Sequence, residues 1–285
     1  MIRLCTFENN SFEIIKNITQ ESYDSLKEDS DFLNKTYKQF VVFKFLQLNL
    51  KDYFEFIEKL TRVPSVNIDY NVVTNKTIVL EANKLILNVL TSFKFFLDNA
   101  ETYLKRENGK ESQIVNEFIS LTNNNYDKSF AYRFLSKMRN YSIHLGFPLE
   151  VLNVDIDFNK ENPEKSICDF ELKIDIEILK KEKSLFGSLH KELIQMDEDI
   201  DLRPLITELS HYIMETQKFL YRKQKEEIDE ALDNIETFVG NHKTDRNQIK
   251  VYSNYDDNDG VVTFNVYEVP FDVIKEYKST YKNWC

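Results

Sequence analysis

The stretch IVLEANKLILNVLTSFKFFLDNAETYLKR, residues 78–106, carries the strongest helical period in the chain. Its apolar side chains recur at spacings of three and four residues, which places them along one face of a helix. They are Leu85, Ile86, Val89, Leu90, Phe93, Phe96 and Leu97. Gly109 follows as a stop signal, because glycine readily adopts the left-handed conformation that ends many helices. The stretch predicts one long helix within a mainly α protein.

Two more helices are expected directly after this one, over about 112–121 and about 128–145. The second should end at Gly146-Phe147-Pro148, since glycine and then proline commonly follow a helix. Before the long helix, residues 31–60 combine spacings of three and four without glycine or proline, so they predict one or two helices, although 39–45 could instead form a strand. The polar segment 62–76, with Pro64, is typical of a loop.

The second half of the chain changes pattern twice. Residues 151–178 alternate apolar and polar side chains on both sides of an Asn/Pro-rich turn, which predicts a β-hairpin. Residues 183–243 return to helical spacing, and Pro204 predicts a break into two helices. Residues 248–267 alternate again around Asp259-Gly260, a typical hairpin turn. A short final helix should follow.

Size and composition limit the possible classes of protein. The 285 residues are 42% hydrophobic and 30% charged, with five glycines and five prolines, which is typical of a compact globular chain. Neither a signal peptide nor a membrane span is predicted, and Cys5, Cys168 and Cys285 lack metal-type spacing. We therefore expect a cytoplasmic protein with reduced thiols, with no membrane partner, no metal and no cofactor. The net charge of −11 argues against non-specific adhesion to nucleic acid.

One segment carries a positive charge although the chain as a whole is acidic. Within YDKSFAYRFLSKMRNYSIHLGFP, residues 126–148, the part up to Leu145 holds four basic residues against one acidic residue, a local charge of +3. On a regular helix Arg133, Lys137, Asn140 and His144 lie within about 60° of one another. Such a stripe suits a local phosphate site, and its alternative explanation is the solvated face of an amphipathic helix.

The run Arg139-Asn140-Tyr141-Ser142-Ile143-His144 resembles the motif of the HEPN ribonuclease family, an Arg, four to six residues and a His, with Asn, Asp or His after the Arg. That family places its motif near the end of a long helix in an all-α bundle, and the helices expected over 78–106 and 128–145 fit this arrangement. The resemblance covers about residues 80–148. It implies a HEPN-like helical bundle. With the two β-hairpins that the alternating patterns predict, the expected fold is mainly α, a HEPN-like helical bundle with inserted or appended β-hairpins.

The resemblance also implies an activity, which is metal-independent cleavage of RNA at a composite site between two copies of the chain. His144 would act as general base or acid, Arg139 would stabilise the phosphoryl oxygens, and Asn140 would bind His144 or the phosphate. Arg133 and Lys137 would hold the RNA backbone. The family is rich in toxins and anti-phage effectors, so an antitoxin or regulatory partner is a further expectation.

The sequence patterns and the resemblance together predict four consecutive parts: an N-terminal helical region (1–75), the HEPN-like core with the motif (76–148), a β-hairpin insertion (149–180), and C-terminal helices with a β-hairpin and a short final helix (181–285). Arg139 and His144 are five residues apart, so on a regular helix their side chains point in directions about 140° apart around the axis. We therefore predict a helix end between residues 142 and 146. The alternatives are a non-catalytic HEPN-like dimerisation, nucleotide-sensing or RNA-binding module, and a helical scaffold that matches by coincidence.

Overall fold

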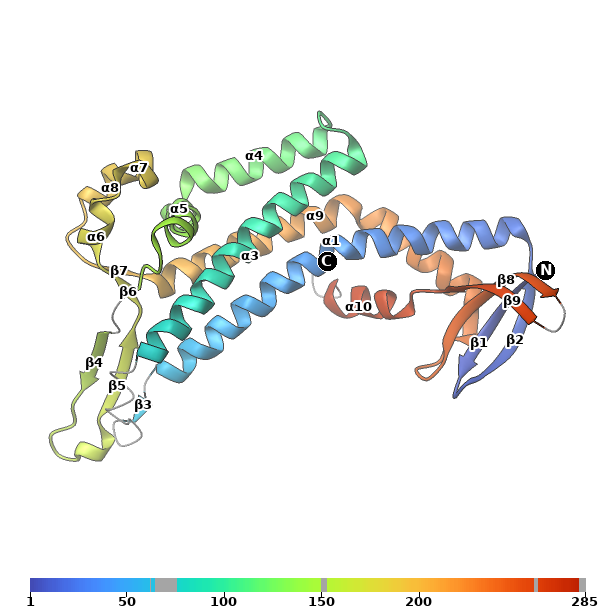
Figure 1. Cartoon of the computed structure of the whole chain (residues 1–285), viewed down its shortest axis with the longest axis horizontal. Coiled ribbons are helices and arrows are strands. Elements are labelled where there is room, and N and C mark those ends of the chain that lie inside the picture. The colour runs from blue at the N-terminus through green and yellow to red at the C-terminus, as the bar shows by residue number, and fades with distance from the viewer. Residues whose placement is uncertain (62, 65–75, 150–152, 259–260, 282–285) are drawn as a thin grey trace. The chain divides into compact units, whose positions relative to one another are not determined.

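The computed structural model describes residues 1–61, 63–64, 76–149, 153–258 and 261–281 (Figure 1). The chain is mainly helical with several antiparallel strands, as predicted. It divides into two compact units, Met1–Val41 with Leu220–Cys285, and Val42–Phe219. This division differs from the four consecutive parts expected, because two long helices, α1 (Gln20–Leu60) and α9 (Leu202–Val239), each contribute residues to both units.

The first unit contains a four-stranded antiparallel sheet in the order β2-β1-β8-β9. Its strands are β1 (Ile2–Glu8), β2 (Ser11–Ile18), β8 (Gln248–Asn258) and β9 (Val261–Glu268). The hairpin expected over 248–267 is confirmed, and its turn at Asp259-Gly260 lies outside the described residues. The helical expectation for 1–75 is wrong for the first 18 residues. Asn9 and Asn10 join β1 to β2 with φ of 51° and 63°, a conformation that asparagine tolerates in two-residue hairpin turns.

Aromatic stacking holds the helices of this unit together. The ring of Tyr281 in α10 (Phe271–Tyr281) stacks on Tyr221 of α9 with centroids 3.7 Å apart, and it also meets Phe40 of α1. The Tyr277 hydroxyl hydrogen-bonds Thr36 Oγ1 at 2.8 Å. Residues 31–60 all belong to the single helix α1, so the alternative of a strand over 39–45 is wrong.

The second unit contains the three helices expected around the motif. They are α3 (Lys76–Asn108), α4 (Gln113–Lys128) and α5 (Phe130–Leu145). Figure 1 shows α3 and α4 side by side as a helical hairpin. The hairpin turns at Gly109, whose φ is 87° and whose N–H donates to Lys105 O at 3.1 Å, so the predicted stop is confirmed. Buried aromatic side chains fill the core: Phe43, Phe93, Phe96, Phe118, Phe134 and Phe186.

Short elements complete this unit. The predicted hairpin appears as β4 (Asn153–Asp157) and β5 (Ile167–Glu171), with β3 (Val63–Pro64) added at the other edge of β5. The remaining elements are β6 (Lys173–Ile174), α6 (Ile176–Lys180), α7 (Lys183–Phe186), α8 (His190–Ile194), β7 (Ile200–Asp201) and 3-10 turns over Pro163–Lys165, Gly187–Leu189 and Gly240–His242. The loop expected over 62–76 lies mostly outside the described residues.

The break into two helices expected at Pro204 is wrong. This proline is the third residue of α9, and a helix tolerates proline in its first turn because the N–H groups there have no partner within the helix. Pro204 thus lies at the start of one long helix. Cys5 and Cys168 are buried free thiols, and Cys285 lies outside the described residues.

Candidate functional site

Both ends of α5, the helix that carries the motif, are fixed by specific residues. At its start the Ser129 hydroxyl accepts a hydrogen bond from Tyr132 N at 3.0 Å and donates one to Glu208 Oε1 at 2.5 Å. This cap satisfies one of the free N–H groups of the first turn. The helix ends at Leu145, and Gly146 follows with φ 104°. The predicted helix end between residues 142 and 146 is confirmed.

A buried side chain of α3 holds the segment after α5. Asn83 is only 2% exposed, its Nδ2 donates to Leu149 O at 2.6 Å, and its Oδ1 accepts from Leu149 N at 3.2 Å. Both backbone groups of Leu149 are therefore satisfied away from water, where a missing bond costs about 1–3 kcal/mol. Sequence reasoning missed Asn83. The available signal was its place between Ala82 and Ile86 in the apolar stripe of α3.

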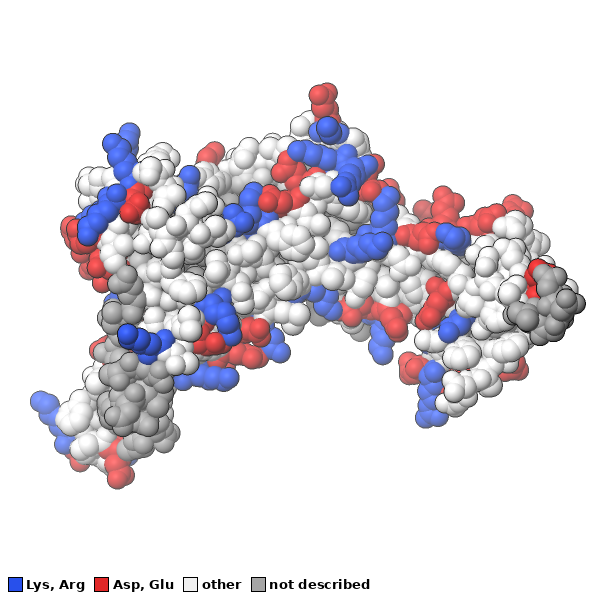
Figure 2. Space-filling view, in the orientation of Figure 1, with Lys and Arg blue, Asp and Glu red and all other residues white. Residues whose placement is uncertain are grey.

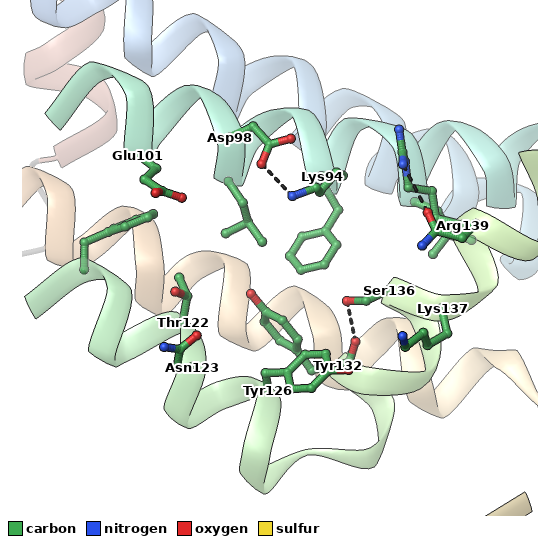
Figure 3. A pocket seen from close by; sticks show the side chains of 15 residues that line it. Lys94, Asp98, Glu101, Thr122, Asn123, Tyr126, Tyr132, Ser136, Lys137 and Arg139 are labelled. Atoms are coloured by element: carbon green, nitrogen blue, oxygen red, sulfur yellow. Dashed lines mark hydrogen bonds and ion pairs between the residues drawn. The ribbon is translucent and has the colours of Figure 1, made fainter. Parts of the chain in front are cut away.

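A pocket of about 330 Å³ opens between α3, α4 and α5 (Figure 3). Its aromatic lining comes from all three helices: Phe93, Phe118, Tyr126 and Tyr132. Its charged and amide side chains are Lys94, Asp98, Glu101, Asn123, Lys137, Arg139 and Asn140. Three of the five predicted site residues, Lys137, Arg139 and Asn140, are thus brought together. Sequence reasoning missed the charged groups of α3, because nothing in the local pattern shows which helix faces α5.

Arg139 has hydrogen-bonding capacity left over in this pocket. Its Nη1 donates to Asn140 Oδ1 at 3.2 Å, whereas its Nε is buried and has no partner among the described residues. A guanidinium offers five donors in a rigid fork, so a ligand oxygen in the pocket could accept hydrogen bonds from its Nη groups, while the buried Nε is out of reach of a ligand. Lys137 lines the same part of the pocket, and none of the described acidic groups forms an ion pair with it.

The pocket also holds a phenol that stays protonated at neutral pH. Burial raises the pKa of Tyr132 above its usual range, because the phenolate would lose its hydration. The ring packs edge-on against Phe93, Tyr126 and Tyr212. Tyr132 therefore forms part of a rigid aromatic wall.

His144 lies outside this pocket. It is exposed, one turn beyond Asn140 on the same face of α5, and about 140° around the helix from Arg139. Its neighbours are exposed apolar side chains: Ile143 is 50% exposed, Leu145 is 52% exposed and Phe147 is 46% exposed. Phe147 also lines a shallow depression with Leu80 and Leu87 of α3. The imidazole is thus accessible and borders an apolar surface.

Arg133 has a different environment from the other predicted residues. Its Nη1 donates to the carbonyl oxygens of Tyr126 and Asp127 at the end of α4, at 3.2 and 2.7 Å. Its Nη2 lies 3.1 and 2.9 Å from the two carboxylate oxygens of Glu192. These bonds occupy the guanidinium, and Arg133 does not line the pocket. Its contacts join the end of α4 to α8.

On the face drawn in Figure 2, basic and acidic side chains are interspersed. Within the described ranges no group of three or more His, Cys, Asp or Glu side chains could hold a metal ion. No helix in the part of the chain that the structure describes has the length and apolar character to span a bilayer.

Comparison of the chain with protein-family models, with curated proteins and with solved structures gave no match.

Proposed function

We propose that the chain is a HEPN-type endoribonuclease that cleaves RNA without a metal ion. The observation that carries the proposal is the cationic part of the pocket, which Lys137, Arg139 and Asn140 line together. A phosphate in this position would accept bonds from the guanidinium, which matches phosphate geometry with two parallel donors. The exposed His144 on the same helix supplies an imidazole, the side chain that most often acts as a general acid or base.

The reaction uses the nucleophile that RNA itself carries. The ribose 2′-OH loses its proton to a general base, and the 2′-oxygen attacks the adjacent phosphorus. A 2′-O–P bond forms, the P–O5′ bond breaks, and the departing 5′-oxygen takes up a proton. The products are a 2′,3′-cyclic phosphate and a 5′-OH. His144 moves the proton, and Arg139 stabilises the charge that develops on the phosphoryl oxygens.

A second copy of the chain completes the site in this proposal. Within one protomer Arg139 lines the pocket and His144 does not, and the residues on either side of His144 in the sequence, Ile143 and Leu145, are exposed and apolar. A two-fold interface on the surface of Leu80, Ile143, Leu145 and Phe147 would bury these groups and bring the His144 of one copy toward the Arg139 of the other. The active form is therefore a homodimer.

The test is incubation of purified protein with total RNA in EDTA, followed by analysis of the fragment ends. We expect cleavage with cyclic phosphate ends by the wild type and no cleavage by His144→Ala. His211→Ala, an exposed histidine of α9, is the matched control and should cleave normally. Intact RNA with both wild type and His144→Ala would overturn the proposal, as would cleavage that persists in His144→Ala.

A second candidate is a non-catalytic HEPN-like module that dimerises, senses a nucleotide or binds RNA. The divergence of Arg139 and His144 within one protomer favours it, because these groups do not converge on one substrate atom without a partner copy. The two functions separate in the assay above: the module binds RNA or nucleotide at the pocket and leaves RNA intact.

The biological role that accompanies the enzyme is that of a cytoplasmic toxin or anti-phage effector. Expression in a bacterial host should then arrest growth, and His144→Ala should relieve the arrest. An antitoxin or regulatory partner would be required to hold such an activity in check. Growth arrest that persists in His144→Ala would instead favour the binding module.

A further inference from the structure

The pocket between α3, α4 and α5 carries opposite charges at its two ends (Figure 3). Lys137 and Arg139 lie at one end, on α5, and Glu101 of α3 lies at the other. Between them Lys94 and Asp98 form an ion pair of 2.6 Å, which neutralises the middle of the pocket. A ligand that fits this pattern has an anionic group at one end and hydrogen-bond donors at the other.

The middle of the pocket suits a flat, partly apolar group. Tyr126 and Tyr132 project into it and meet edge to face, with centroids 6.3 Å apart and planes inclined at 83°. Proteins bind unstacked nucleobases against aromatic side chains and read them through hydrogen bonds to their edges. Tyr132 is only 4% exposed, so the partly exposed ring of Tyr126 is the one that a base would contact. The pocket volume of about 330 Å³ is at the lower end of the range for small-molecule sites, roughly 300–1,000 Å³. It therefore accommodates a single nucleotide.

We infer that the pocket binds one guanosine nucleotide unit of single-stranded RNA, with its 3′-phosphate at Arg139 and Lys137 and its guanine at Glu101. This inference rests on the proposed function, since the bound nucleotide is the one whose 2′-OH attacks the phosphate at Arg139. It adds a base preference for guanine. A base inside a duplex cannot enter, so the nucleotide leaves the stack before it binds.

Guanine follows from the chemistry of the carboxylate. An ionised carboxylate only accepts hydrogen bonds, and it does so through two neighbouring oxygens. Guanine alone among the four bases presents two adjacent N–H donors on its pairing edge, at N1 and the 2-amino group. Adenine and cytosine place a ring acceptor beside their amino group, and uracil places carbonyl oxygens beside its single N–H, so each sets an acceptor against one carboxylate oxygen.

Glu101 is available for this role. Its contact within the protein is an i,i+4 ion pair with Lys105 on the helix surface, and exposed pairs of this kind contribute little to stability. Asn123 of α4 lies on the same side of the pocket, where its amide can donate a hydrogen bond to the guanine 6-oxygen. Asp98 forms a similar i,i+4 pair with Lys94, but it is the poorer candidate because it lies between Glu101 and Arg139, in the middle of the pocket.

The test measures binding of the four nucleoside 3′-monophosphates by calorimetry, without any need for cleavage. We expect the wild type to bind 3′-GMP about tenfold more tightly than the other three, the effect of one hydrogen bond to a charged group. Glu101→Gln should reduce this preference to about threefold or less. Glu55→Gln removes a comparable i,i+4 pair with Lys51 on α1 and should keep the full preference.

Arg139→Gln provides the test of orientation. It should weaken binding of all four nucleotides by a similar factor, because the phosphate is common to them. Equal affinity of the wild type for the four nucleotides, or a guanine preference that survives Glu101→Gln, would overturn the inference.

The outcome for the inference is distinct from the outcome for the proposed function. RNA cut by the wild type after all four bases alike, together with equal nucleotide affinities, would keep the ribonuclease and remove the guanine site. A guanine preference that depends on Glu101, together with intact RNA, would keep the guanine site and favour a nucleotide-sensing module over the enzyme. Cleavage that falls mainly after guanosine, and loses that preference in Glu101→Gln, would support both.

Discussion

Asn140 and His144 lie one turn apart on the same face of α5, yet only Asn140 lines the pocket. Asn140 accepts a hydrogen bond from Arg139, so the amide connects to the guanidinium and not to the imidazole in the single chain. His144 is exposed outside the pocket, next in sequence to the exposed Ile143 and Leu145. If the two groups act on one phosphate, they come from two copies of the chain.

Complementation between two inactive variants follows from this arrangement. Arg139→Ala and His144→Ala should each abolish cleavage alone. After unfolding and refolding of an equal mixture, half of the dimers are mixed and each has one intact site, so activity should return to about a quarter of wild type. RNA cleavage in EDTA is the readout. A mixture that stays inactive would show that each copy uses its own Arg139 and His144.

The apolar surface next to His144 should hold the dimer. Phe147→Ser removes an exposed ring from this surface, and we expect a shift toward monomer in analytical ultracentrifugation together with loss of cleavage. Phe158→Ser removes a ring after β4 that is more exposed than Phe147, and this control should leave the dimer intact.

A different group of exposed apolar side chains could form the dimer interface, which would contradict this prediction. Phe45 and Leu48 of α1 lie exposed, and the ring of Phe45 contacts Phe95 of α3. If Leu48→Ser dissociates the dimer and Phe147→Ser does not, the copies pair through α1 and α3. His144 would then remain outside the interface, and the composite site would be excluded.

The helices of the proposed core were predictable because each carries its own signals. The period of apolar residues and Gly109 predicted a helix over 78–106, and α3 covers Lys76–Asn108. Gly146 likewise marked the end of α5. The strand β1 was missed although Asn9-Asn10 between Phe7 and Phe12 is a hairpin turn signal. Its pairing with β8 was not predictable, since Leu4 and Val251 meet from opposite ends of the chain.

The candidate site was only partly predictable for a similar reason. Residues on one helix, such as Lys137 and Asn140, could be grouped from their spacing alone. The side chains that face them, such as Lys94 and Glu101, come from α3, and the packing of α3 on α5 decides which of its residues line the pocket. Spacing also grouped Arg133 with the site, whereas tertiary contacts with Glu192 occupy it.

Asn83 should be important for stability and not for chemistry. Asn83→Ala leaves the N–H and carbonyl of Leu149 without partners in a buried position, so we expect the free energy of unfolding to fall by about 2–4 kcal/mol. Denaturant titration measures this loss. Asn116→Ala, on the exposed face of α4, is the control and should change the stability by no more than about 0.5 kcal/mol. Equal effects of the two variants would show that the Asn83 bonds do not hold the end of α5.

Tyr132 should contribute to loss of stability at alkaline pH. Burial raises the pKa of its phenol in the folded state, whereas the unfolded chain ionises at about pH 10. The contribution of the neutral Tyr132 phenol to the free energy of unfolding is fully present below pH 10. It is lost as the pH rises, by about 1 kcal/mol between pH 10 and pH 11. Tyr132→Phe cannot ionise, so its free energy of unfolding should fall less steeply over this range. Parallel pH profiles of the two proteins would contradict the prediction.

Arg133 and Lys137 lie four residues apart on α5, yet they should respond to substitution in opposite ways. Arg133→Gln breaks the bonds to the end of α4 and to Glu192, so we expect a loss of about 1–3 kcal/mol in the free energy of unfolding. The affinity of this variant for RNA should not change. It is measured on folded protein that also carries His144→Ala, which prevents cleavage. Lys137→Gln should keep its stability within about 0.5 kcal/mol, because the side chain lines the pocket without an ion pair to the described acidic groups.

The salt dependence of RNA binding separates these two roles. If Lys137 contacts a phosphate, its loss should reduce the slope of log Kd against log salt concentration by about 0.7, the value for one contact on a single strand. Arg133→Gln should bind RNA with the wild-type slope. A reduced slope in Arg133→Gln would mean that its guanidinium leaves Glu192 for the RNA, and the phosphate-binding surface would then extend along α5 beyond the pocket.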